Sequence, residues 1–68
     1  MSKFAQRLKE LREEKGLTIS QLALGLQVSI PCVSRWEANL RIPNADNIVL
    51  VCNFFNVSAD YILGIKDY

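Results

Sequence analysis

Few side chains in this sequence are of a type that could catalyse a reaction or hold a metal ion. The 68 residues include no histidine and two cysteines, Cys32 and Cys52. Because the two thiols fit no C-x-x-C pattern and no histidine accompanies them, a structural zinc site is not expected. The chain also lacks a glycine-rich phosphate loop and a definable carboxylate pair, and it is too short to enclose a substrate. We therefore expect no enzyme activity, no cofactor and no metal.

The charged side chains nearly cancel. Eight Lys and Arg residues oppose seven Asp and Glu residues, which leaves a net charge of +1. The bases crowd the first fifteen residues, where they alternate with glutamates: Lys3, Arg7, Lys9, Arg12 and Lys15. We interpret this stretch chiefly as a solvated helix face and only secondarily as a patch that faces nucleic acid. Composition alone does not indicate a nucleic-acid partner, because many small nucleic-acid-binding domains are visibly basic.

Length and hydropathy limit the class of protein. The longest apolar run, residues 48–52, is far shorter than the roughly 20 residues that cross a bilayer. The N-terminus turns polar at once, so we expect no signal peptide, no membrane partner, a cytoplasmic location and reduced thiols. We expect one domain over residues 1–68, with a thin margin of stability, because a chain of this size buries only about 60% of its surface.

Helix caps divide the chain into five short helical segments and predict an all-α fold. Thr18 and Gln21 have the spacing of a capping box, with a hydroxyl and an amide that can each accept a backbone N–H. The predicted N-caps of the second to fifth helices are Thr18, Ser29, Asn44 and Ser58. The helices are expected to end near Gly16, Leu26, Asn39, Phe55 and Gly64. No segment alternates with the period of a strand over more than a few residues.

Residues 18–39 contain two helices of about two turns each, joined by residues 27–29. So short a connection forces a steep crossing, which is typical of a helix-turn-helix unit. The apolar residues expected to turn inward at the crossing are Leu22, Ala23, Leu26, Val28, Val33 and Trp36. The opposite face of the second of these helices then carries Ile30, Pro31, Ser34 and Arg35 outward.

This region resembles the helix-turn-helix of the lambda-repressor/Cro-like regulators, also called the xenobiotic-response-element type. The matching run is Leu-Ala-Leu-Gly-Leu-Gln-Val-Ser-Ile-Pro-Cys-Val-Ser-Arg-Trp-Glu, residues 22–37. Flanking matches extend the resemblance over essentially the whole chain: Arg41-Ile-Pro43, Ile48, Phe55-Asn-Val57-Ser58 and Tyr61-Ile-Leu-Gly64. The resemblance implies a compact five-helix domain with the helix-turn-helix at helices two and three. It also implies a sequence-specific regulator of transcription, most often a repressor, that binds double-stranded DNA.

By this resemblance the third helix would enter the major groove as the recognition helix. Arg35 would fork onto guanine O6 and N7, a contact worth roughly 1–3 kcal/mol of discrimination. Ser34 would reach a base edge or a phosphate, while Ile30 and Pro31 would offer apolar contact to thymine methyl groups. The residues that would contact phosphate are Thr18, Ser20, Gln21, Asn39 and Arg41. Arg12 and Glu37 match a structural ion pair that joins helix one to the end of helix three.

Three residues depart from the family's pattern. Gln27 replaces the usual turn glycine, so a residue with a side chain is expected at positive φ, which costs on the order of 1 kcal/mol. Asn39 replaces another common glycine, which is a milder change. Ile19 stands where glutamine is frequent and removes one phosphate contact. Together with the low net charge, these departures predict modest affinity for each half-site.

We therefore expect a homodimer on a palindromic operator. One monomer offers few base contacts, and two recognition helices about 34 Å apart would double them. The expected interface lies in the C-terminal helix and tail and uses Tyr61, Ile65 and Tyr68.

Two alternatives use the same scaffold. One is a protein-interaction module, indicated by apolar Ile19, Ile30 and Pro31 on a face that should be polar. The other is an antitoxin that binds both DNA and a protein partner. Of the two cysteines, Cys52 is interpreted as a buried packing residue. Cys32 is interpreted as an unreactive thiol, and a redox-sensing role for it is the less favoured alternative.

Overall fold

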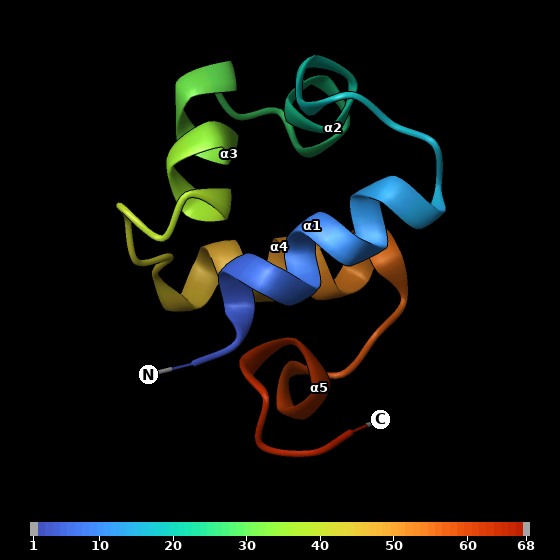
Figure 1. Ribbon diagram of the computed structural model, residues 1–68, viewed down its shortest axis with the longest axis vertical. Coiled ribbons are helices and arrows are strands. Elements are labelled where there is room, and N and C mark those ends of the chain that lie inside the picture. The colour runs from blue at the N-terminus through green and yellow to red at the C-terminus, as the bar shows by residue number, and fades with distance from the viewer. Residues whose placement is uncertain (1, 68) are drawn as a thin grey trace.

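Five helices make up the regular structure of residues 2–67, the part of the chain that this computed structural model describes (Figure 1). They are α1 (Phe4–Glu14), α2 (Ile19–Leu26), α3 (Ile30–Glu37), α4 (Ala45–Phe55) and α5 (Ala59–Leu63). Residues 2–67 contain no strand, so the predicted all-α fold class is confirmed. Within the same residues, no helix combines the length and the apolar character needed to cross a membrane.

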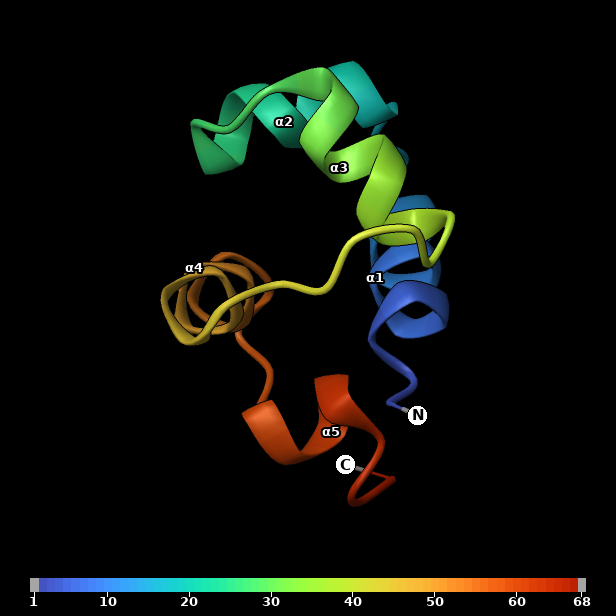
Figure 2. The same ribbon diagram turned by 90° about the vertical axis from the view of Figure 1, so that its left-hand side faces the viewer.

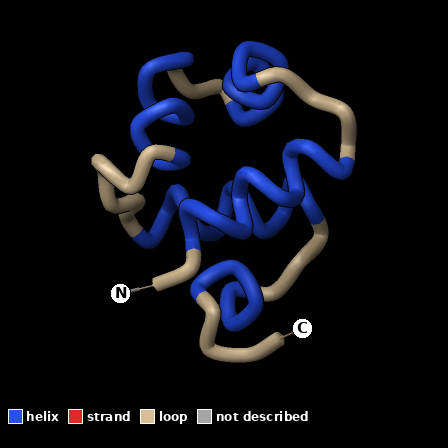
Figure 3. Tube along the Cα trace, viewed as in Figure 1, coloured by secondary structure: helices blue, strands red, loops and turns tan. Residues whose placement is uncertain are grey.

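The predicted caps begin four of the helices. At α2, Thr18 Oγ1 accepts from the Gln21 amide at 3.1 Å, and Gln21 Oε1 accepts from the Thr18 amide at 2.8 Å. Asn44 caps α4 in the same reciprocal way, with Asn47 in place of the usual Glu or Gln. Ser29 and Ser58 cap α3 and α5 through their hydroxyl oxygens. The starts of these four helices are therefore fixed by contacts between residues three positions apart, where the loops of Figure 3 pass into helices.

Left-handed residues end the helices or follow their last turn. Gly16 and Gly64 have φ values of 68° and 81°, as expected for helix terminators. Gln27 has φ 60° and ψ 39°, so the strain predicted from its replacement of a glycine is present in the turn between α2 and α3. Asn39 and Asn56 adopt the same region with φ values of 60° and 57°. Asparagine tolerates this conformation better than glutamine does.

The helices enclose one apolar cluster. In Figure 1, α1 crosses the middle of the molecule, with α2 and α3 above it and α5 below, and Figure 2 shows α4 on the other side of the interior from α1. Trp36 of α3 is 1% exposed and meets Phe4 of α1 edge to face, with ring centroids 5.8 Å apart. The other buried apolar residues are Leu8, Leu11, Leu22, Ala23, Leu26, Val33, Val51, Phe55 and Ile62. The interpretation of Trp36 as a core residue is thus confirmed.

Replacing Gln27 by glycine is expected to stabilise the protein. Glycine adopts φ 60° without the Cβ clash, and the relief exceeds the entropy that glycine adds to the unfolded chain, for a net gain of about 1 kcal/mol. Urea denaturation followed by circular dichroism measures the change. The control is Gln27→Ala, which keeps a Cβ and should gain nothing; equal stability of the two variants would contradict the strain.

Candidate nucleic-acid interface

The turn between α2 and α3 brings the two helices into contact and determines which of their side chains are buried. Residues 27–29 separate the helices, and the Val28 amide donates to the Ala23 carbonyl at 3.0 Å across the turn. Five of the six residues predicted to face inward are buried: Leu22, Ala23, Leu26, Val33 and Trp36. Val28 is half-buried and packs against the core. The crossing therefore leaves one side of α3 uncovered.

The uncovered side of α3 carries the four residues assigned to base contact. Ile30, Pro31, Ser34 and Arg35 are all exposed. Their positions within the eight-residue helix share one face, because residues four apart lie above each other. Figure 2 shows α3 and the loop that follows it on the side facing the viewer. The structure therefore gathers these four side chains on a single exposed face.

The residues assigned to phosphate contact are also exposed: Thr18, Ser20, Gln21, Asn39 and Arg41. The capping box of α2 engages the acceptor oxygens of Thr18 and Gln21 with backbone amides. It leaves their donors, the Thr18 hydroxyl hydrogen and the Gln21 side-chain NH2, for another acceptor. The amides of Ile19 and Ser20 open the helix, where the positive end of the dipole favours an anion. The start of α2 is thus rich in donors.

An ion pair holds α3 against α1. Arg12 Nε lies 2.7 Å from Glu37 Oε2, and its Nη2 donates to Glu37 Oε1 at 3.1 Å. Arg12 Nη1 also donates to the Leu17 carbonyl at 2.8 Å. The pKa of Arg12 is raised, chiefly by the hydrogen bond to Glu37. Desolvation lowers it, but by less. The pair predicted from the sequence is present, and it fixes the end of α3 relative to α1 and the loop before α2.

Arg7 is not on the solvated face to which the sequence assigned it. It is 8% exposed, and its Nη1 donates to the backbone carbonyls of Tyr61 and Lys66, the latter at 2.7 Å. Its Nη2 lies 3.5 Å from Asp67 Oδ1. The assignment was wrong because these partners are more than fifty positions away, and no local pattern relates them to Arg7. The exposed bases near α3 are therefore Arg35 and Arg41.

Burial bears on two further expectations, one for Ile19 and one for the cysteines. Ile19 is half-buried and packs against the core, so the apolar surface proposed for a protein-interaction module is reduced to Ile30 and Pro31. Cys32 and Cys52 are both free, half-buried and packed against the core. Burial raises the pKa of the Cys52 thiol, which disfavours the reactive thiolate at neutral pH.

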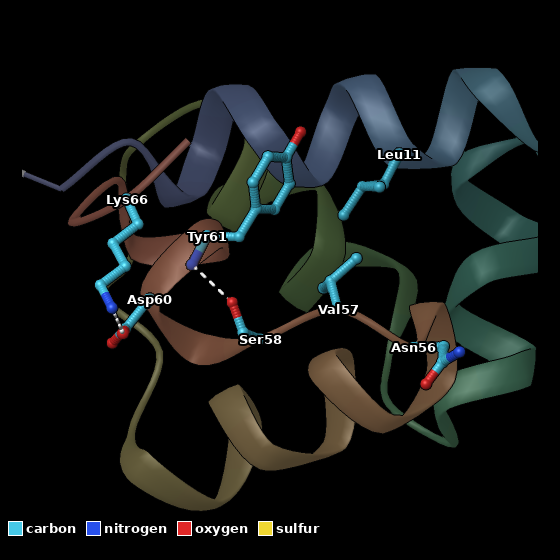
Figure 4. Close-up of a pocket in the computed structure, with 7 residues that line it drawn as sticks. All are labelled: Leu11, Asn56, Val57, Ser58, Asp60, Tyr61 and Lys66. Atoms are coloured by element: carbon cyan, nitrogen blue, oxygen red, sulfur yellow. Dashed lines mark hydrogen bonds and ion pairs between the residues drawn. The ribbon is translucent and has the colours of Figure 1, made fainter. Parts of the chain in front are cut away.

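The residues assigned to self-association lie around α5. Ile65 is 69% exposed, and Tyr61 is half-buried beside an open hollow of about 480 Å³ (Figure 4). Tyr68 lies outside the described residues. The hollow is lined by Leu11, Asn56, Val57, Ser58, Asp60, Tyr61 and Lys66. The sequence did not predict the hollow, because its lining comes from α1, the α4–α5 loop, α5 and the segment after α5.

Comparison with known proteins finds relatives over most of the chain. A sequence model of the family described as helix-turn-helix matches residues 8–62. The uncharacterized HTH-type transcriptional regulator YobD of Bacillus subtilis (strain 168) is 36% identical over 64 residues, 94% of this chain and 57% of YobD. The HTH-type transcriptional activator BcrR of Enterococcus faecalis is 38% identical over 61 residues, 90% of this chain and 30% of BcrR. The chain thus spans between about a third and just over half of these relatives.

A solved structure shows the same fold. The P22 c2 repressor, crystallised with the synthetic operator 9T, superposes with a TM-score of 0.84 at 24% identity. The match covers 93% of this chain and 96% of the repressor chain. The five helices therefore have the arrangement of repressor-type helix-turn-helix domains, as the sequence indicated.

Replacing Glu37 by glutamine should destabilise the protein by about 2–3 kcal/mol, because the Arg12 guanidinium would keep its buried position without a counter-charge. Urea denaturation gives the loss. The control is Glu13→Gln, an exposed glutamate on the same helix as Arg12, which should change stability by less than about 0.5 kcal/mol. If the two variants unfold at the same urea concentration, the ion pair does not hold α3 in place.

Proposed function

Because this chain belongs to the helix-turn-helix family of transcriptional regulators, whose members bind DNA and are not enzymes, we propose that it reads a specific double-stranded operator with α3 as a symmetric dimer. The observation that carries this proposal is the single exposed face of Ile30, Pro31, Ser34 and Arg35. An eight-residue helix is about 12 Å long, a length that fits the major groove of B-DNA.

Arg35 is the main base reader in this proposal. Its guanidinium presents paired N–H donors, which match the O6 and N7 acceptors of guanine. The Arg35 carbonyl accepts from the Leu40 amide at 2.9 Å, so the backbone at this end of α3 is anchored. Ser34 lies beside it, and Ile30 and Pro31 offer an apolar surface to thymine methyl groups. This combination would favour a half-site containing both guanine and thymine.

The start of α2 and the loop after α3 bind the phosphates that flank the groove. Thr18 and Gln21 keep free donor hydrogens, as described above, and the helix dipole adds to the attraction. Ser20, Asn39 and Arg41 contribute further donors from exposed positions. Contacts of this kind fix the register of α3 on the duplex without reading its sequence.

A dimer is proposed because the charge available to one copy is small. Three of the eight bases, Arg7, Arg12 and Lys66, are engaged in intramolecular contacts, and the net charge of the chain is +1. Self-association would use the exposed Ile65 and the hollow beside Tyr61. The Ile65 amide donates to the carbonyl of Asp60, which lines the hollow, so the protruding side chain and the hollow are neighbours. A side chain that protrudes beside a hollow would let two copies exchange the same contact, as two-fold symmetry requires.

Repression is the regulatory outcome that we propose. Occupying an operator excludes other proteins from the same duplex, whereas activation requires an additional favourable contact with a partner. The partial burial of Ile19 argues against a protein-interaction module without DNA affinity, since it leaves Ile30 and Pro31 as the exposed members of the apolar surface on which that alternative depended.

The first test is a salt titration with random-sequence duplex DNA. Phosphate contacts release counterions, so the logarithm of the affinity should fall linearly with the logarithm of the salt concentration, with a slope that grows with the number of contacts. Fluorescence anisotropy of labelled duplex measures the affinity. An interaction module would show no duplex binding at any salt concentration, and this result would exclude the proposed function.

The second test separates base readout from phosphate binding. An operator is first selected from a random pool of duplexes, and the variants are then compared on it. Arg35→Ala should cost about 1–3 kcal/mol on the selected operator and flatten the preference at one base pair. Arg41→Ala should weaken the selected and random duplexes by the same factor and reduce the salt slope by about 1. Both arginines are exposed, so neither change should alter stability. Identical behaviour of the two variants would reject the assignment of Arg35 as the reader.

A further inference from the structure

Arg7 links the two ends of the chain. Its guanidinium extends from α1 to the end of α5 and the residues after it, residues 63–67, which we call the C-terminal strap. Arg7 Nη1 donates to the carbonyls of Tyr61 and Lys66, and Nη2 approaches the Asp67 carboxylate. The Lys3 amide adds a bond to the Leu63 carbonyl at 3.2 Å. The strap is therefore attached to the first two turns of α1 by several polar contacts.

The same guanidinium also stacks on the ring of Tyr61. Arg7 Cζ lies 4.3 Å from the centroid of the Tyr61 ring, a stacking distance at which cation and ring attract. Tyr61 lines the hollow together with Leu11, which follows Arg7 by one turn of α1 (Figure 4). The ring thus contacts Arg7 and also borders the hollow. The ring position is therefore set by Arg7 together with α5, where the Ser58 hydroxyl accepts from the Tyr61 amide at 3.0 Å.

The surface proposed for self-association consists of parts that Arg7 contacts or flanks, and the Ile65 and Lys66 amides also donate to the Asp60 carbonyl of α5. The Tyr61 ring stacks on Arg7, and Ile65 lies in the strap between two residues whose backbone carbonyl groups are fixed, Leu63 by Lys3 and Lys66 by Arg7. Arg7 itself is 8% exposed, too little to contact a second copy. Its influence on an interface would act through Tyr61 and the strap.

We propose that Arg7 is the positioning residue of the self-association surface: it fixes the Tyr61 ring and the C-terminal strap where they meet a second copy of this chain, a role that rests on the dimer proposed above. A lysine cannot replace it. Arginine offers a planar fork that bonds two carbonyls while stacking on a ring, whereas lysine offers one compact ammonium group. The charge of α1 is the same in both cases, so attraction to DNA is unchanged.

The experiment compares wild type and Arg7→Lys by sedimentation equilibrium and by binding to two duplexes, a full palindrome and a single half-site. Arg7→Lys should raise the dimer dissociation constant at least tenfold and lower affinity for the palindrome. Affinity for the half-site should stay within twofold, because α3 is untouched. Unchanged self-association in a folded Arg7→Lys variant would overturn the proposal.

Two controls separate positioning from a general loss of stability. Asp67→Asn removes the outer ion pair, whose carboxylate is 98% exposed, and should leave the dimer within twofold of wild type. Ala23→Gly weakens α2, at the other end of the molecule from α5 in Figure 1, and should lower stability without changing the dimer dissociation constant. If Ala23→Gly weakens the dimer as much as Arg7→Lys, Arg7 has only a structural role.

A second variant serves if Arg7→Lys does not fold. Gly64 has φ 81°, and a Cβ there would lie 2.8 Å from Lys3 Cγ, so Gly64→Ala strains the backbone of the strap while Arg7 stays. It should weaken the dimer as Arg7→Lys does, and wild-type self-association in this variant would reject the proposal. The two proposals fail in different ways: a wild-type chain that stays monomeric with and without operator rejects the dimer itself, whereas a wild-type dimer that the variants leave intact rejects only the role of Arg7.

Discussion

The three residues between α2 and α3 are the constraint on which the exposed surface depends. A connection this short forces the helices to cross steeply, and Gln27 adopts a left-handed conformation at φ 60° to make it. The crossing buries one side of α3 through Val33 and Trp36, and so it exposes the opposite side. The face that carries Arg35 therefore follows from the turn, and a strained residue is retained where that geometry is set.

Two arginines of α1 stabilise the arrangement and are not available to a ligand. Arg12 joins Glu37 at the end of α3, and Arg7 joins the carbonyls of Tyr61 and Lys66 after α5. One helix thus holds α3 through one of these side chains and the C-terminal strap through the other. This division of roles is compatible with a net charge of +1 in a DNA-binding family, because the bases proposed to contact DNA, Arg35 and Arg41, are exposed.

The local elements could be predicted from the sequence because their causes are local. A cap joins residues three positions apart, as at Thr18 and Gln21, and a left-handed terminator depends on a single residue, as at Gly16. Periodicity likewise predicted which residues of α2 and α3 turn inward, and Val28 in the turn between them packs against the core. The family's pattern added the pairing of Arg12 with Glu37, which no local rule provides.

What the sequence by itself determined was the all-α class, the helix boundaries, the helix-turn-helix and the exposed face of α3. The tertiary structure alone decided that Arg7 is buried, that Ile19 is half-buried against the core and that a hollow lies beside Tyr61. The physical reason is distance along the chain. Arg7 is stabilised by carbonyl groups more than fifty positions away, and only packing of α1 against α5 brings them within hydrogen-bonding distance.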